Sequence, residues 1–354
     1  MVRKSMLALI VVALAATGCS TGAKSTTNHT STASGAARLT GSGGLPENVQ
    51  PIDAENFANN AMKGKKIFYA ALGSGYALED QWRNVFRDSF TQMGAQYKEN
   101  VADVDPQRLA QNAQSLLNEK PDVLIVHAGD SSNLNSLIKA AHAQGVYVFN
   151  LNLMTSAAVD GYVGGNFNLA EGALAKSMAD DCNKRGKKKV AIIGGFPGDG
   201  LSLVAIPAYE REFKAAGLEV VANQPQSYDA TKAHDMAVTV MQQHPDLCGF
   251  IGTWDNMMIG AANAVTQANK VGQVVVYTSD SSVTGCKAVA DGTISKALDY
   301  GVGIMGDQMV ALVQYYLQTK IPAGSTRVAV FPRFKLLDKS STLSGGSCYT
   351  GTPL

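Results

Sequence analysis

Residues 66–72 read KIFYAAL, and residues 78–93 read LEDQWRNVFRDSFTQM. The first segment is a short apolar run, which is typical of a buried strand. In the second segment Trp82, Val85, Phe86 and Phe90 recur at helical spacing. A buried strand followed by an amphipathic helix is the repeating unit of a parallel sheet, so this stretch predicts an α/β fold.

The same alternation continues along the chain in two successive sets. In the first set we expect further strands at 95–101, 123–127, 146–151 and 162–164, with helices at 106–118 and 134–144. In the second set we expect strands at 190–194, 219–223, 249–253, 274–278 and 296–300, with helices at 169–184, 207–216, 232–243, 257–268, 285–291 and 303–319. Two sets predict two similar lobes. Ligands bind beyond the carboxyl ends of such strands, so facing lobes would enclose one cleft.

The N-terminus has the sequence pattern of an export signal. Arg3 and Lys4 precede a short apolar run at 6–16, and small residues lead to Cys19. This pattern predicts a signal peptide at 1–18. The final residues resemble the lipobox of bacterial lipoproteins, in which the Cys becomes the lipidated first residue; Ala16 stands where that motif usually has Leu. The alternative is an ordinary cleaved signal followed by an incidental Cys.

The segment after Cys19 is rich in Ser, Thr, Gly and Ala. It holds too little apolar surface to offset the entropy of ordering it, so we expect a flexible tether at 19–62. We therefore expect a protein exported to the bacterial cell envelope, on the periplasmic side or the outer face of a membrane. It would contact that membrane through its lipid anchor alone.

Bulk composition excludes some functions. The formal net charge of +1 gives no indication of nucleic-acid binding. No second apolar stretch is long enough to cross a membrane. Beyond Cys19 the chain has four cysteines, and an even number in an exported chain favours disulfides. Four cysteines allow three pairings, and free buried thiols are the alternative; the four are Cys182, Cys248, Cys286 and Cys348.

Four motifs carry a resemblance to a known family. They are QWR at 81–83, VGGN at 163–166, QHPDL at 243–247 with TWDNM at 253–257, and TSD at 278–280 with KAVADG at 287–292. In this order they resemble the periplasmic sugar-binding proteins of the ribose and galactofuranose type, which are receptors for ABC importers. The resemblance covers about residues 63–336.

The resemblance implies a type I periplasmic-binding fold, in which two Rossmann-like lobes with parallel sheets are joined by a three-segment hinge. The N-lobe would comprise 63–165 and 301–328. The C-lobe would comprise 166–300 and 329–354, including a C-terminal tail. In that arrangement Cys182 and Cys248 lie just before neighbouring strands, which favours a Cys182–Cys248 pair and leaves Cys286 for Cys348.

The candidate ligand-binding residues lie at strand ends and in the turns that follow them, because such positions offer hydrogen-bond groups and aromatic faces to a polar ligand. Family positions and this chemistry together select ten: Ser74, Tyr76, Trp82, Arg83, His127, Asn152, Tyr209, Trp254, Asp280 and Tyr300. For single residues the alternative is structural, since 73–76 could be a plain turn and Trp82 could be core.

The chain departs from the family pattern at several of these positions. Asn152 and Leu153 stand where relatives have an Asp-Arg pair, Trp254 replaces an Asn, and Tyr300 replaces a Gln. Tyr209 is expected to fill the place of a ligand-gripping Arg. Loss of the charged pair and gain of a Trp predict a flatter or less hydroxylated ligand than a standard sugar.

These observations predict a monomeric solute receptor that closes around a sugar, polyol or related small molecule and delivers it to an ABC permease. A sensor that presents its ligand to a chemoreceptor or kinase, and a nucleoside-type ligand, are the alternatives. We expect no enzyme, cofactor or metal site. The segment GGFPGDG at 194–200 lacks the Gly-Lys-Ser/Thr ending of a phosphate loop, and the five histidines are scattered.

Overall fold

The computed structural model describes residues 51–343, 348 and 349. The expected signal peptide, the lipidated Cys19 and the tether up to residue 50 lie outside these residues. The tether was also expected to include residues 51–62. In the structure Pro51–Met62 instead forms helix α1, which contacts helix α10 (Val302–Thr319). Met62 is fully buried in the core, and this burial anchors the end of α1.

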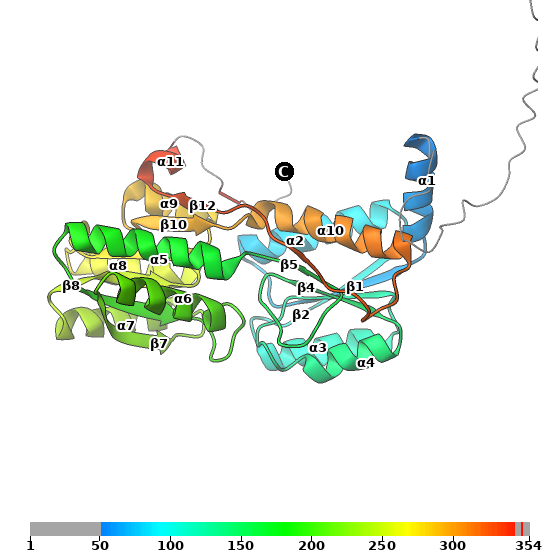
Figure 1. Cartoon of the computed structure of the whole chain (residues 1–354), viewed down its shortest axis with the longest axis horizontal. Helices are drawn as coiled ribbons and strands as arrows, with labels where there is room; N and C mark the ends of the chain where they lie inside the picture. The colour runs from blue at the N-terminus through cyan, green and yellow to red at the C-terminus, as the bar shows by residue number, and fades with distance from the viewer. Residues whose placement is uncertain (1–50, 344–347, 350–354) are drawn as a thin grey trace, which may run out of the picture. The chain divides into compact units, whose positions relative to one another are not determined.

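The first lobe is built on a six-stranded sheet in the order β11-β5-β4-β3-β1-β2, with every neighbouring pair parallel. Helices α2 and α10 cover one face of the sheet, and α3 and α4 cover the other (Figure 1). Its elements are β1 Lys66–Ala71, α2 Ala77–Gln92, β2 Gln96–Val101, α3 Pro106–Asn118, β3 Val123–Val126, α4 Asn135–Ala143, β4 Tyr147–Leu151, β5 Gly161–Val163, α10 and β11 Val328–Val330.

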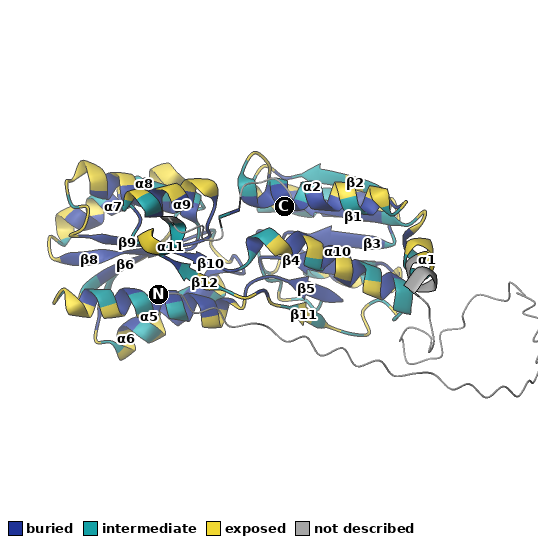
Figure 2. Ribbon diagram, turned by 90° about the horizontal axis from the view of Figure 1, so that it is seen from above, coloured by how far each residue is buried: buried dark blue, intermediate teal, exposed yellow. Residues whose placement is uncertain are grey.

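The second lobe has a sheet in the order β12-β10-β9-β8-β6-β7, parallel except for the pairing of β12 with β10. Helices α7, α8 and α9 lie on one face and α5 and α6 lie on the other, with the central strands β6, β8 and β9 buried between them (Figure 2). Its elements are α5 Phe167–Lys184, β6 Lys189–Gly194, α6 Ser202–Ala215, β7 Glu219–Pro225, α7 Ala230–Gln243, β8 Leu247–Gly252, α8 Asp255–Gln267, β9 Val275–Ser279, α9 Val283–Asp291, β10 Lys296–Asp299, β12 Lys335–Leu337 and α11 Lys339–Leu343.

The chain crosses between the sheets three times: from β5 to α5, from β10 to α10, and from β11 to β12. The predicted two-lobed α/β fold is therefore confirmed. The third crossing was expected after residue 328. It lies a few residues later, because β11 pairs within the first sheet as far as Val330. The second crossing needs glycine at Gly301, whose φ is 85° and where an added Cβ would lie 2.3 Å from Pro332.

Helix α6 begins earlier than the expected residue 207. The carboxylate of Asp199 accepts hydrogen bonds from the backbone N–H groups of Leu201 and Ser202, at 2.9 and 2.7 Å. These bonds satisfy donors that the first turn of a helix leaves free, so the helix begins at Ser202 with Pro207 inside it. Tyr209 consequently lies two turns into the helix.

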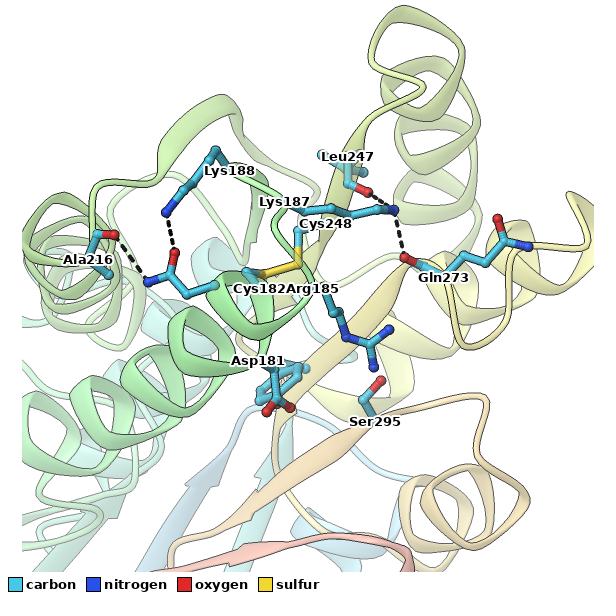
Figure 3. The surroundings of a disulfide bond; sticks show 12 residues. Asp181, Cys182, Arg185, Lys187, Lys188, Ala216, Leu247, Cys248, Gln273 and Ser295 are labelled. Atoms are coloured by element: carbon cyan, nitrogen blue, oxygen red, sulfur yellow. Dashed lines mark hydrogen bonds between the residues drawn. A yellow bond between two sulfur atoms is a disulfide. The ribbon is translucent and has the colours of Figure 1, made fainter.

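Two disulfides join the four cysteines in the expected pairs. Cys182 at the end of α5 bonds Cys248 in β8, with Cα atoms 5.7 Å apart (Figure 3). Beside it, the ammonium of Lys187 donates to the carbonyl groups of Leu247 and Gln273 at 2.9 and 2.8 Å. Cys286 in α9 bonds Cys348, with Cα atoms 6.1 Å apart.

In the part of the chain that the structure describes, no helix combines the length and the apolar character needed to cross a membrane.

Candidate ligand-binding site

One cavity is lined by residues of both lobes, and its empty volume, including space open to solvent, is about 390 Å³. Most of the lining residues directly follow the carboxyl ends of parallel strands, where the fold places ligands. The lining consists of Leu72, Tyr76, Leu78, Val104, His127, Asn152, Leu153, Leu201, Tyr228, Thr253, Trp254, Asp280 and Tyr300. Six of the ten sequence-predicted site residues are therefore brought together: Tyr76, His127, Asn152, Trp254, Asp280 and Tyr300.

His127 is held by a buried carboxylate of the first lobe. Its Nδ1 lies 2.6 Å from Oε2 of Glu79, and the hydroxyl of Tyr69 donates to the other oxygen of the same carboxylate. Glu79 is fully buried, so this pairing supplies the hydrogen bonds that a buried carboxylate requires. The arrangement directs Nε2 of His127 towards the side-chain amide of Asn152, 3.4 Å away.

Asn152 and Asp280 occupy equivalent backbone positions in the two lobes. Each follows a strand, β4 or β9, and each adopts a left-handed conformation, with φ of 61° and 72°. Asn and Asp tolerate this conformation better than other non-glycine residues. Oδ1 of each side chain is buried and has no hydrogen-bond partner among the described residues. Unpaired buried acceptors at strand ends are available to a ligand.

Aromatic rings form another part of the lining. Trp254 immediately precedes α8, and its ring meets Tyr76 of the first lobe edge to face, with centroids 5.4 Å apart. On its other side Trp254 meets Tyr228 with centroids 5.7 Å apart. The hydroxyl of Tyr228 donates to Asp199 at 3.1 Å, which fixes the orientation of that ring. These side chains give the cavity a continuous aromatic surface shared by both lobes.

Asp280 is the acidic residue of the lining. Burial raises its pKa well above the ordinary value, and the negative charge of Asp255 raises it further. Hydrogen bonding from Tyr300 acts in the opposite direction. Asp255 is itself fully buried, and burial raises its pKa to about 6 although the backbone N–H of Ser282 donates to it at 2.8 Å. Burial in the second lobe thus makes both carboxyl groups harder to ionise than they are in water.

The other four predicted site residues, Ser74, Trp82, Arg83 and Tyr209, lie outside the cavity lining. Trp82 is fully buried beneath His127, with ring centroids 5.4 Å apart, and its N–H donates to the carbonyl of Val302 at 3.1 Å. Arg83 follows Trp82 in the same helix. Because adjacent helical side chains point about 100° apart, Arg83 points in a different direction from Trp82, and it is not part of the cavity lining.

Arg83 forms ion pairs with Glu99 and Asp80, so its guanidinium is already occupied. The hydroxyl of Tyr209 donates to the buried carboxylate of Glu171 inside the second lobe. Ser74 is exposed and is not part of the cavity lining.

Sequence reasoning missed the aliphatic lining and two polar members, Thr253 and Tyr228. Thr253 directly follows β8 and precedes Trp254, so its position after a strand end could have identified it. Tyr228 lies in a turn after the edge strand β7, at a left-handed φ of 59°, and no local pattern marks it. The missed aliphatic residues are Leu72, Leu78, Val104 and Leu201; Leu153, which stands at the family's Asp-Arg pair, also lines the cavity.

The glycine-rich segment at the end of β6, residues 194–200, contacts the first lobe. The N–H of Ser131 donates to the carbonyl of Gly198 at 3.2 Å. At Gly200 an added Cβ would lie 2.2 Å from the carbonyl oxygen of Met154, and at Gly195 it would lie 2.2 Å from the ring of Tyr228. The glycines therefore allow the backbone of the second lobe to approach the first lobe and the cavity closely.

No group of three or more His, Cys, Asp or Glu side chains in the described ranges has the arrangement needed to hold a metal ion. The chemistry that this lining offers is hydrogen bonding from a few polar groups and contact with aromatic and aliphatic surfaces, which is the composition of a small-molecule site.

Two α/β lobes, three crossings and one cavity lined from both sides define the class of two-lobed ligand-binding proteins. The sequence matches the periplasmic binding protein domain over residues 72–321, and the chain belongs to that family. This finding confirms the family resemblance seen in the motifs.

Curated relatives agree with this assignment. The D-allose-binding periplasmic protein of Escherichia coli (strain K12) is 31% identical over 173 residues, which cover 47% of this chain and 56% of the relative. The ribose import binding protein RbsB of Salmonella typhimurium (strain LT2) is 24% identical over 201 residues, covering 55% of this chain and 65% of the relative. The chain thus matches between half and two thirds of the length of these proteins.

Solved structures share the fold. An ABC transporter solute binding protein from Burkholderia graminis C4D1M, crystallised in complex with D-arabinose, superimposes with a TM-score of 0.73 at 18% identity. The match covers 81% of this chain and 99% of that structure. A likeness at this identity shows the fold, and the ligand must be argued from the cavity itself.

Proposed function

We propose that this protein is an extracytoplasmic solute-binding lipoprotein that captures a small polar ligand between its lobes and delivers it to an ABC importer. The observation that carries the proposal is the cavity lined by both lobes. A ligand that contacts both lobes binds the closed state more tightly than an open state, so binding favours closure. The closed form is then the form that a permease recognises.

The names of the relatives support a sugar, polyol or related compound. They include proteins for D-allose and ribose, and a neighbour in complex with D-arabinose. The family consists of binding and transport proteins, and we propose no catalytic role for the cavity. Lipidation at Cys19 would hold the protein at the membrane while the lobes remain in the aqueous phase.

A thermal-shift and calorimetric screen of sugars, polyols and nucleosides tests the proposal. A ligand present at a hundred times its Kd stabilises the folded state by about 2.7 kcal/mol, which is readily measured. Trp254→Ala should abolish this stabilisation because it removes the aromatic centre of the lining. Val271→Ala, a change at an exposed residue outside the lining, should leave it intact. If no small solute stabilises the wild-type protein, the proposal is wrong.

A further inference from the structure

The cavity lining, as far as the structure describes it, contains a buried carboxyl group but neither Lys nor Arg. Among the described residues that line it, Asp280 is the one carboxylate. Asp280 is 2% exposed. The groups that act most strongly on its ionisation include three further carboxylates, Asp255, Glu171 and Asp299. A buried carboxylate in such surroundings is costly to ionise unless an opposite charge is brought to it.

The free hydrogen-bonding atoms of the lining are mainly acceptors. Oδ1 of Asp280 and Oδ1 of Asn152 are buried and unpartnered within the described structure, and the hydroxyl oxygen of Thr253 is also unpartnered. The side-chain nitrogen of Asn152 is directed towards His127. A ligand that satisfies this set must supply N–H or O–H donors, and an ammonium group supplies up to three.

The aromatic surface adds an attraction for positive charge. Tyr76, Trp254 and Tyr228 form a continuous series of rings, with successive centroids 5.4 and 5.7 Å apart. Aromatic faces carry negative quadrupole density and attract cations within about 6 Å of the ring centroid. The rest of the lining is largely aliphatic, including Leu72 and Val104, which suits a carbon skeleton with few hydroxyl groups.

We propose that the ligand carries a protonated amine on a compact, largely apolar or cyclic skeleton, with the ammonium group paired to Asp280 and bounded by the rings of Trp254 and Tyr228. This inference rests on the proposed function and specifies its ligand class. An organic cation suits the site better than a metal ion, because no metal-holding group of side chains occurs in the described part of the chain.

Matched pairs of ligands separate charge from shape. The probes are glucosamine against glucose, cyclohexylamine against cyclohexanol, and 1-amino-2-propanol against 1,2-propanediol, each titrated calorimetrically at pH 7 and two salt concentrations. We expect the amine of at least one pair to bind at least tenfold more tightly than its alcohol. Asp280→Asn should remove the preference, and Trp254→Leu should reduce it while retaining apolar contact. Asp235→Asn, which removes an exposed charge outside the cavity, should preserve it.

Three outcomes decide the inference. An amine preference that disappears in Asp280→Asn supports it. Binding of neutral sugars or polyols with no preference for any amine overturns it and leaves the proposed function standing. If neither these pairs nor the sugars, polyols and nucleosides of the wider screen bind the wild-type protein, the proposed function fails together with the inference.

Discussion

The rings of Tyr76 and Trp254 meet edge to face across the cleft, with centroids 5.4 Å apart. Tyr76 precedes the first helix after β1, and Trp254 precedes the first helix after β8, so each ring stands at the carboxyl end of a parallel sheet. The contact links the lobes through side chains that also line the cavity.

The absence of a side chain at Gly200 allows the two lobes to approach each other closely at Met154. Gly200→Val should hold the lobes apart, because its Cβ would overlap the backbone of Met154 in the other lobe. We expect at least a tenfold loss of affinity for a ligand identified by the screen, and a larger radius of gyration in small-angle X-ray scattering. Gly303→Ala is the control, since its nearest contact is an ordinary 3.7 Å. Unchanged scattering and affinity in Gly200→Val would contradict the closing contact.

Glu171 should make stability depend on pH. Its burial raises the pKa from an ordinary 4.5 to about 7, although Ser279 and Tyr209 donate hydrogen bonds to it. Between these values the folded state binds a proton that the unfolded state releases, so the free energy of unfolding falls as pH rises from about 4.5 to about 7. The loss is on the order of 3 kcal/mol.

Denaturant unfolding from pH 4.5 to 8.5 checks this dependence. Glu171→Gln should make the slope in that window shallower, and the wild-type slope minus the variant slope gives the contribution of Glu171. The variant keeps the contribution of Asp255, whose raised pKa acts in the same direction. Parallel curves for the two proteins would show that Glu171 is not protonated in the folded state.

The two disulfides should differ in their effect on binding. Each closes a loop of more than sixty residues, with sequence separations of 66 and 62, so removing either should cost about 2–4 kcal/mol of stability. Cys348 also precedes Tyr349, which bonds through its backbone to Ser281 next to Asp280. Serine replacement of Cys286 and Cys348 should therefore weaken ligand affinity as well.

Serine replacement of Cys182 and Cys248 provides the matched comparison, because these residues do not line the cavity. It should lower the melting temperature and leave the affinity of the folded protein unchanged. Equal affinities in both double variants would mean that Cys348 and Tyr349 do not support the site.

The two lobes were predictable because most buried strands are apolar runs and the helices that cover them have an apolar face, as in KIFYAAL and the helix after it. Their positions at strand ends also predicted that His127, Asn152 and Asp280 lie together, and the structure has all three in the lining of one cavity, since parallel strands bring their carboxyl ends to one edge. Trp82 and Tyr209 were misplaced for a different reason. Their placement depends on helical phase and on where α6 begins, which the Asp199 cap shifts towards the N-terminus.

Tyr228 and the contact at Gly200 could not be predicted, because both depend on how a turn of one lobe meets other segments that are distant in sequence. Tyr228 reaches Trp254 from a left-handed turn, and Gly200 meets Met154 across the cleft. Neither relationship has a local sequence pattern.

Capture of a ligand tests the central claim most directly. The wild-type protein and Trp254→Ala are incubated with the small-molecule fraction of a bacterial extract, desalted, and analysed by native mass spectrometry. The account predicts a one-to-one complex of the wild-type protein with a small molecule, and no complex for Trp254→Ala. No complex with the wild-type protein, or equal capture by both proteins, would contradict it.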